Sequence, residues 1–242
     1  MCGRYALNIS GDDLAIEFAA GIKDVSFTSR NWNISPTTSI PFINAQDNQG
    51  VNRSINTASW GLIPSWAKDA SRQSNAINAR VESVADKPTF RAAFRARRCL
   101  IPVTGYYEWA TELGSYKPKQ PFFISSSDKS TLAIAGIYES WINPKNKQPI
   151  TTAAIITRAA LGKLIPIHNR MPIILPKSLW PTWLSSAQLE KDEVNDYLKM
   201  IDLPNSDQQL TFWPVSDEVN NARNTGEQLA KAIELPPAAT LF

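Results

Sequence analysis

Apolar residues recur along the chain in two patterns, and each pattern predicts one kind of element. In the first, short runs rich in Val, Ile, Thr, Phe, Tyr and Trp are bounded by polar or turn-forming residues, as is typical of β-strands. These runs predict strands at residues 3–9, 40–45, 51–60, 99–109, 121–126, 131–142, 150–157 and 210–215. Strands therefore dominate the middle of the chain.

The second pattern places apolar residues three or four positions apart, which predicts helices with one apolar face. One helix is predicted to begin after Ser10, which can cap it, with Leu14 and Phe18 on the same face. Residues 88–98 have the same spacing through Phe90 and Phe94. The clearest helix is predicted at 185–201, where the apolar positions are Leu189, Val194, Tyr197, Leu198 and Ile201.

The order of these elements predicts the fold class. Strands and helices do not alternate as they do in a parallel α/β sheet, so we predict an α+β fold. The chain has no internal repeat and no flexible linker that would separate two units. We expect a single domain over residues 1–235 and a short tail over 236–242.

Composition narrows the classes of function. The chain has 242 residues, 43% of them hydrophobic, which is enough for a sizeable core. No run of about 18 apolar residues could span a membrane, and signal-peptide features are lacking, so we expect a cytoplasmic protein, associated with the nucleoid when on DNA. Two cysteines and one histidine argue against a zinc site, and we predict no metal and no cofactor. The net charge of +3 is modest, so nucleic-acid binding would depend on clustered arginines.

The first five residues, Met1-Cys2-Gly3-Arg4-Tyr5, carry unusual chemistry. Removal of Met1 would leave Cys2 with a free α-amine beside its thiol, and both groups titrate close enough to neutral pH to be partly available as nucleophiles. Such a 1,2-aminothiol can add to an aldehyde twice and close a thiazolidine ring. The alternative is that Cys2 is only a small residue in a frayed terminus, which is the commoner case.

The segment after the third predicted strand holds further candidates. Trp66 follows Pro64 in a predicted loop, where an exposed ring could stack on single-stranded nucleic acid, although packing in a core or lid explains it equally well. Asn78, Arg80 and Glu82 alternate with apolar residues, so in an extended chain they would share one face and could line a cleft. A solvated edge strand is the simpler explanation of that alternation.

Ionisable candidates follow in the next two predicted elements. Arg91, Arg95 and Arg98 would share one face of the helix predicted at 88–98, where they could contact phosphates or face solvent. Glu108 lies in an aromatic segment, where burial would raise the pKa of its carboxyl and suit it to carry protons, although a paired structural glutamate is as good an explanation. Cys99 lies in an apolar run and is interpreted as an inert core thiol.

The only histidine, His168, lies between Pro166 and Pro172, which keep this segment from forming a regular helix. A rigid loop could aim the imidazole ring, and a pKa near neutrality would suit proton transfer. Asn169 and Arg170 add hydrogen-bond donors beside it. A lone loop histidine is otherwise often only a hydrogen-bonded spacer.

Together these motifs resemble the SRAP (SOS response-associated peptidase) family, of the HMCES and YedK type. The matching segments keep their order along nearly the whole chain: MCGRY at 1–5, NISPT at 33–37, WGLIPSW at 60–66, NARVE at 78–82, RCLIPVTGYYEW at 98–109, HNRMP at 168–172 and PVSDEVNN at 214–221. This combination is highly specific. The resemblance implies a strongly bent, partly barrel-like sheet of mixed and antiparallel strands, flanked by helices.

The resemblance also implies a function, which is to detect abasic sites in single-stranded DNA and shield them by a covalent crosslink. The family's N-terminal cysteine, here Cys2, forms a thiazolidine with the ring-opened deoxyribose. The other catalytic positions of the family map to Asn78, Glu108 and His168. The DNA contacts implied are Arg4, Arg80, Trp66, Asn33, Pro36 and Arg170.

The chain departs from the family at one position, because Asn169 stands where the family usually has aspartate. This change would affect the rate more than the activity itself. Weak lyase activity and reversal of the crosslink are also implied, and we expect a monomer. The alternatives are a cysteine peptidase that uses Cys2 with His168 as its base, and a non-covalent module that binds single-stranded DNA.

Overall fold

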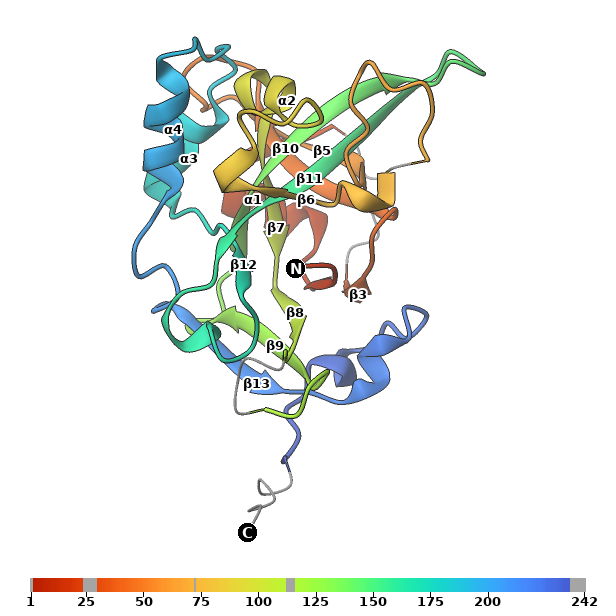
Figure 1. The fold of residues 1–242 in the computed structure, drawn as a ribbon, viewed down its shortest axis with the longest axis vertical. Helices are drawn as coiled ribbons and strands as arrows, with labels where there is room; N and C mark the ends of the chain where they lie inside the picture. Colours follow the sequence, from red (N-terminus) through yellow and green to blue (C-terminus); the bar gives the residue numbers. More distant parts are fainter. Residues whose placement is uncertain (1, 24–29, 72, 112–115, 236–242) are drawn as a thin grey trace.

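A computed structural model of the chain describes residues 2–23, 30–71, 73–111 and 116–235. It has a mixed α+β fold, as predicted, with two β-sheets and short helices packed around them (Figure 1). Met1 and the predicted tail at 236–242 lie outside the described residues. In the described ranges, no helix is both long enough and apolar enough to cross a membrane.

Five strands close into a barrel-like ring. They are β4 (Ser39–Ala45), β5 (Arg53–Trp60), β7 (Arg98–Val103), β10 (Leu132–Ile142) and β11 (Pro149–Ala159). Antiparallel pairs run in the order β11-β10-β7-β4-β5. The ring closes because β5 pairs in parallel with β11, with Ser59 opposite Thr152. This closure confirms the bent, partly barrel-like sheet of mixed strands.

Three strands of three residues each join this ring at its margins: β2 (Ala20–Ile22), β6 (Asn78–Arg80) and β12 (Arg170–Pro172). β2 pairs with β5, while β6 and β12 both pair with β11. Only the first part of the extended segment considered at 78–82 is a strand, because a 3-10 turn, η2 (Val81–Ser83), follows it. Strands this short produce no periodic pattern, so β2 and β12 were not predicted.

The second sheet contains β1 (Tyr5–Leu7), β3 (Asn31–Ile34), β8 (Gly105–Trp109), β9 (Pro121–Ser126) and β13 (Leu210–Pro214). Its order is β13-β9-β8-β1-β3, with antiparallel neighbours. The prediction of one strand over 99–109 is wrong, because the chain leaves the barrel after β7 and enters the second sheet with β8 (Figure 1). The backbone N–H of Thr104, between the two strands, donates to Ala6 O at 2.8 Å.

The helices are short. α1 (Gly11–Phe18) forms as predicted: the Ser10 hydroxyl accepts the N–H of Asp13 at 3.1 Å, and Leu14 and Phe18 are buried. α2 (Arg91–Ala96) covers only the middle of the helix predicted at 88–98. The 3-10 helices besides η2 are η1 (Gln73–Asn75), η3 (Gly162–Leu164), η4 (Lys177–Leu179), η5 (Asp217–Asn220) and η6 (Glu227–Ala230).

The helix predicted at 185–201 is wrong over its first half. α3 (Trp180–Leu184) ends before it, and α4 (Glu193–Ile201) begins well inside it. The intervening segment uses its backbone for tertiary contacts: the N–H of Leu189 donates to Arg95 O at 2.8 Å, which ties the segment to α2. Packing therefore overrides the helical spacing of its apolar residues.

Arg98 lies in β7 and not on a helix face with Arg91 and Arg95, so that prediction is wrong as well. Its side chain is buried. Its guanidinium donates to the backbone carbonyls of Phe94, Arg95, Trp183, Ser185 and Ala187. These bonds use all the donors of a guanidinium and leave none for a phosphate.

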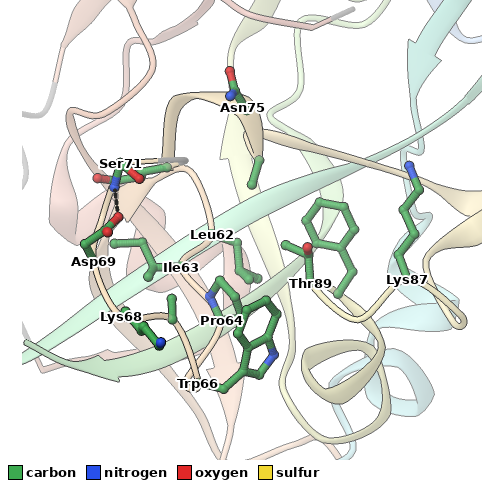
Figure 2. Close-up of a pocket in the computed structure, with 14 residues that line it drawn as sticks. Leu62, Ile63, Pro64, Trp66, Lys68, Asp69, Ser71, Asn75, Lys87 and Thr89 are labelled. Atoms are coloured by element: carbon green, nitrogen blue, oxygen red, sulfur yellow. Dashed lines mark hydrogen bonds between the residues drawn. The ribbon is translucent and has the colours of Figure 1, made fainter.

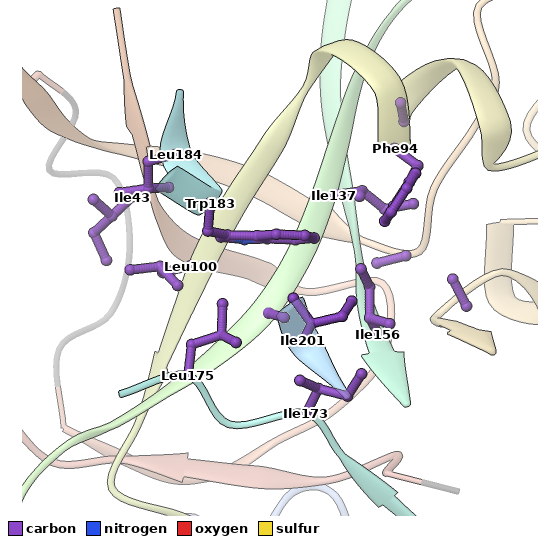
Figure 3. Packing of buried hydrophobic residues seen from close by; sticks show 14 of the residues in the cluster. Ile43, Phe94, Leu100, Ile137, Ile156, Ile173, Leu175, Trp183, Leu184 and Ile201 are labelled. Atoms are coloured by element: carbon purple, nitrogen blue, oxygen red, sulfur yellow. The ribbon is translucent and has the colours of Figure 1, made fainter. Parts of the chain in front are cut away.

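The apolar interior forms two large clusters. One, shown in Figure 3, lies between the barrel and the helices around Trp183, whose indole N–H donates to Cys99 O at 2.8 Å. The other contains residues of both sheets, including Cys2, Trp60 and Cys99. Cys99 is fully buried and burial raises its thiol pKa, which confirms it as a core thiol.

Candidate functional site

Cys2 lies on the segment that leads into β1 and is completely buried. Arg4 O accepts the N–H of Tyr107 at 2.9 Å, so the start of the chain runs antiparallel to β8, where Glu108 follows. Burial, together with the negative charge of Glu108, raises the pKa of the Cys2 thiol. With Met1 attached, the Cys2 thiol is therefore protonated at neutral pH. The partly ionised thiol expected once Met1 is removed stays a prediction.

Asn78 contacts Cys2 directly. Its side-chain amide donates to the carbonyl oxygen of Cys2, with 2.7 Å between Nδ2 and O. β6 holds the backbone of Asn78 against β11, opposite Ile155. The amide oxygen Oδ1 is buried and accepts no hydrogen bond from the residues described, so it leaves a polar acceptor close to Cys2.

Glu108 lies in β8, buried to 3% exposure. Burial raises the pKa of its carboxyl to about 7, as the aromatic segment led us to expect. Both protonation states are therefore populated at neutral pH, and the carboxyl can donate or accept a proton. Because its charge acts on the Cys2 thiol, the two groups form one electrostatic unit.

His168 precedes β12 and is partly buried. Burial is the main cause that lowers the pKa of the imidazole to about 4. The expectation of a pKa near neutrality is therefore wrong, and the ring is neutral at pH 7. Its Nδ1 accepts the backbone N–H of Arg170 at 2.9 Å. A backbone N–H can only donate, so Nδ1 carries no proton and the ring proton is on Nε2.

The loop that carries His168 is anchored to the same cluster as Cys2. Ile167 is buried in that cluster, and its carbonyl accepts the N–H of Thr111 at 2.9 Å, just beyond β8. Of the four predicted catalytic residues, the structure places Asn78 and Glu108 around Cys2. It ties the His168 loop to the end of the segment that carries Glu108.

Two tyrosines near Cys2 were not predicted as part of the site. Tyr5 and Tyr106 are fully buried, and their hydroxyl groups make no hydrogen bond within the described ranges. Burial raises the pKa of both, and the charge of a Cys2 thiolate would raise it further. The sequence signal for Tyr106 was its place two residues before Glu108, because alternate side chains along a strand share one face.

Arg4 is held by the C-terminal part of the chain. Its Nη1 donates to Asn33 Oδ1 at 2.8 Å and to Val219 O at 2.9 Å. Asn33 is only 2% exposed, and its amide donates to backbone carbonyls of Val219, Asn221 and Asn224. The polar atoms of Asn33 therefore fix Arg4, which the sequence could not indicate because the partners are distant along the chain.

The remaining predicted DNA contacts have different surroundings. Arg80 is exposed at the end of β6, and Pro36 is partly exposed in the turn between β3 and β4. Arg170 is paired with Glu82, at 2.6 Å between Nη1 and Oε1 and 3.0 Å between Nη2 and Oε2. Glu82 was considered only as a cleft-lining residue.

Trp66 is 65% exposed, which excludes the interpretation that it packs in the core. It lines a pocket of about 470 Å³ between the 62–76 segment and residues 87–90, and Figure 2 shows its indole beside Pro64. Lys68 and Lys87 add positive charge to the same pocket. The lining of the pocket extends to Ala76, two residues before Asn78 along the chain.

Throughout the described ranges, no three side chains of His, Cys, Asp or Glu come together as metal ligands would.

The chain matches the family model described as SOS response associated peptidase (SRAP) over residues 1–222. The chain belongs to the SRAP family.

Relatives named as abasic site processing proteins match over almost the whole chain. The abasic site processing protein YoaM from Bacillus subtilis is 34% identical over 236 residues, which cover 96% of this chain and 98% of YoaM. The abasic site processing protein HMCES from Rattus norvegicus is 32% identical and covers 96% of this chain and 76% of its own length. A crystal structure of a Bacteroides thetaiotaomicron protein shares the fold, with a TM-score of 0.81 at 22% identity over 96% of this chain and all of that one.

Proposed function

We propose that this chain processes abasic sites in single-stranded DNA by crosslinking to them, through a thiazolidine between Cys2, freed of Met1, and the ring-opened deoxyribose. The names of the SRAP relatives support abasic-site processing. The observation that carries the chemistry is Glu108, a buried carboxyl with a pKa of about 7 whose charge acts on Cys2. Asn78 fixes the backbone of Cys2 against the barrel.

The reaction begins with opening of the sugar. The C1′–O4′ bond breaks, the C1′ hydroxyl loses its proton to give the aldehyde, and O4′ gains a proton through water. His168 is neutral at pH 7 with its ring proton on Nε2. It donates a hydrogen bond to O4′ as charge develops there and does not itself give up a proton.

The amine of Cys2 then adds to C1′. Glu108 relays two amine protons in turn: the first goes to the aldehyde oxygen as the C–N bond forms and gives the C1′ hydroxyl, and the second goes to that hydroxyl, which leaves as water and gives the imine. The thiol next adds to the imine carbon. Its proton passes through Glu108 to the nitrogen, and the ring closes with one water released overall. A protonated thiol can add only if a neighbouring group takes up its proton. The Glu108 carboxyl, whose pKa is about 7, can serve in this proton transfer and in those from the amine.

DNA binding is assigned to the exposed groups around this interior. Trp66 stacks on a base, Arg80 contacts phosphate, and Arg4 contributes charge from its place on Asn33. Pro36 and Arg170 complete the contact set, with Arg170 acting while it is paired to Glu82. Failure of the thiol to close the ring would leave an imine, which accounts for weak lyase activity. Reversal would follow the same steps backwards.

A denaturing gel tests this proposal. The protein is incubated with single-stranded oligonucleotides that contain either one abasic site or an intact base, and intact mass confirms that Met1 is absent. The expected result is a denaturation-resistant adduct with the abasic strand only, at the summed mass minus one water. Absence of that adduct would contradict the proposal. Equal non-covalent binding of both strands, measured on a native gel of the same mixtures, would favour a simple binding module.

The peptidase alternative needs a thiolate at Cys2, and the raised pKa of this thiol does not favour one. Peptide turnover that disappears in Cys2→Ala would nevertheless establish it. Cys2→Ser distinguishes the two chemistries further, since a serine amine can form the imine but gives no sulfur ring.

A further inference from the structure

Glu82 and Arg170 form a two-point ion pair beside the His168 loop. Both guanidinium Nη atoms donate to the Glu82 carboxylate, at 2.6 and 3.0 Å. The side chain of Arg170 is 12% exposed, whereas that of Glu82 is 52% exposed. Arg170 lowers the pKa of Glu82, so the carboxylate is ionised at neutral pH.

The same guanidinium is fixed from a second side. Nη2 of Arg170 donates to Thr157 O at 2.7 Å, within β11. β12 pairs with β11 through Arg170 opposite Ala159, so backbone and side chain of Arg170 both attach to this strand. Bidentate pairing to a carboxylate adds geometric definition that a single contact lacks.

The backbone of Arg170 in turn holds His168, because its N–H donates to Nδ1 at 2.9 Å. This bond decides which nitrogen of the ring carries the proton. A chain of contacts thus runs from the Glu82 carboxylate through Arg170 to the imidazole. Glu82 also follows Asn78 closely, so the 78–82 segment contacts Cys2 at one end and the His168 loop at the other.

We propose that Glu82 is a positioning residue: by clamping Arg170 it fixes the 168–170 turn, so that His168 presents only its Nε2–H to the reacting sugar. The catalytic consequence rests on the proposed crosslinking function. The orientation of the ring does not, and it can be measured without DNA. A half-exposed ion pair adds little to overall stability, so its loss is expected to disturb the turn more than the fold.

Nitrogen NMR tests the orientation, because His168 is the only histidine in the chain and its ring signals need no assignment. At pH 7 the wild-type ring is expected as the Nε2–H tautomer alone. In Glu82→Ala, the Nδ1–H tautomer should become visible, and in Glu82→Gln, which keeps one acceptor, it should appear to a lesser extent. Asp202→Ala is the matched control, since it removes an exposed carboxylate that lies 2.8 Å from the guanidinium of Arg158, in the neighbouring strand β11.

Single-turnover crosslinking tests the consequence. Glu82→Ala should slow adduct formation about tenfold at saturating DNA, as expected when a catalytic group is misplaced, while Asp202→Ala should match the wild type. If Glu82 acts through His168, removing Glu82 should have no further effect in a His168→Ala background.

An unchanged tautomer in Glu82→Ala would overturn the proposal. So would a changed tautomer with an unchanged rate, or an equal slowing in the His168→Ala background. If the wild type forms no adduct, the proposed function fails instead, and the NMR result still decides whether Glu82 orients the ring.

Discussion

The two cysteines of the chain share one apolar cluster, and both are fully buried with raised thiol pKa values. Cys99 lies in β7 opposite Gly136, and burial accounts for its shift. Cys2 has the same burial, but the Asn78 amide and the Glu108 carboxyl lie beside it. Burial alone makes a thiol inert, whereas burial beside a carboxyl that titrates near neutral pH provides a route for its proton.

The largest expected difference separates the two thiols themselves. Cys2→Ala should abolish the denaturation-resistant adduct with abasic single-stranded DNA, because the remaining amine can form only a hydrolysable imine and ring closure needs the sulfur. Cys99→Ala should leave the crosslinking rate within about twofold and lower the free energy of unfolding by ~1 kcal/mol, as truncation of a small core side chain does. Rates come from denaturing gels and stabilities from urea unfolding. An adduct that persists in Cys2→Ala would contradict the comparison.

Removing the carboxyl of Glu108 should make the Cys2 thiol nearly as unreactive as the Cys99 thiol. Glu108→Gln keeps the shape of the side chain but cannot carry a proton, so crosslinking should slow by about 100-fold or more. The wild-type rate should rise as the pH passes through about 7, where the carboxylate forms, and the variant should lack this inflection. A pH–rate profile from single-turnover gels provides the measurement. An unchanged inflection in the variant would assign the proton transfers to another group.

The same carboxyl should make stability depend on pH. Its pKa is about 7 in the folded state and near 4.5 ordinarily, so the folded state holds the proton more tightly. The associated stability is complete below pH 4.5 and is lost as the pH rises through 7, by ~3 kcal/mol. Urea unfolding of wild type and Glu108→Gln should therefore diverge in favour of the variant between pH 4.5 and 8. Parallel curves would place Glu108 in a wetter environment.

A smaller effect is expected from the amide that holds Cys2. Asn78→Ala removes the hydrogen bond to the Cys2 carbonyl, so the aminothiol loses its fixed position and crosslinking should slow about tenfold. Affinity for the abasic strand should stay within about twofold, since phosphate contacts dominate it. Fluorescence anisotropy with a Cys2→Ala background measures that affinity without crosslinking. A loss of affinity equal to the loss of rate would make Asn78 a DNA contact instead.

The smallest effect on chemistry is expected from the exposed face. Trp66→Ala should weaken binding of single-stranded DNA by about fivefold to tenfold through lost stacking. The single-turnover rate at saturating DNA should not change, because the ring is not part of the interior around Cys2. Anisotropy and gel rates on one protein sample separate the two quantities. A slower rate at saturation would mean that Trp66 also places the sugar.

Sequence reasoning was most accurate where local chemistry decides the outcome. The Ser10 cap of α1 and the buried face of Leu14 and Phe18 follow from immediate neighbours. The aromatic residues around Glu108 likewise indicated a buried segment, and burial raises the pKa of its carboxyl. The whole-chain pattern of motifs also indicated the family and the barrel-like sheet.

It failed where residues distant along the chain decide the outcome. His168 has a lowered pKa because of burial, and nothing in its loop sequence indicates how far the ring is shielded from solvent. Leu189 has helical neighbours, but its N–H is used by Arg95. Asn33 and Glu82 act on Arg4 and Arg170, which only the fold brings to them.

Arg98 has a consequence for the cooperativity of the molecule. Its guanidinium donates hydrogen bonds to backbone carbonyls in the last turn of α2 and the last turn of α3. The negative ends of two helix dipoles thus face one cation. An ammonium has only three donors, so lysine could not satisfy the same set. Both helices and strand β7 are thereby expected to unfold as one unit, and the barrel that supports the Cys2 site does not open without them.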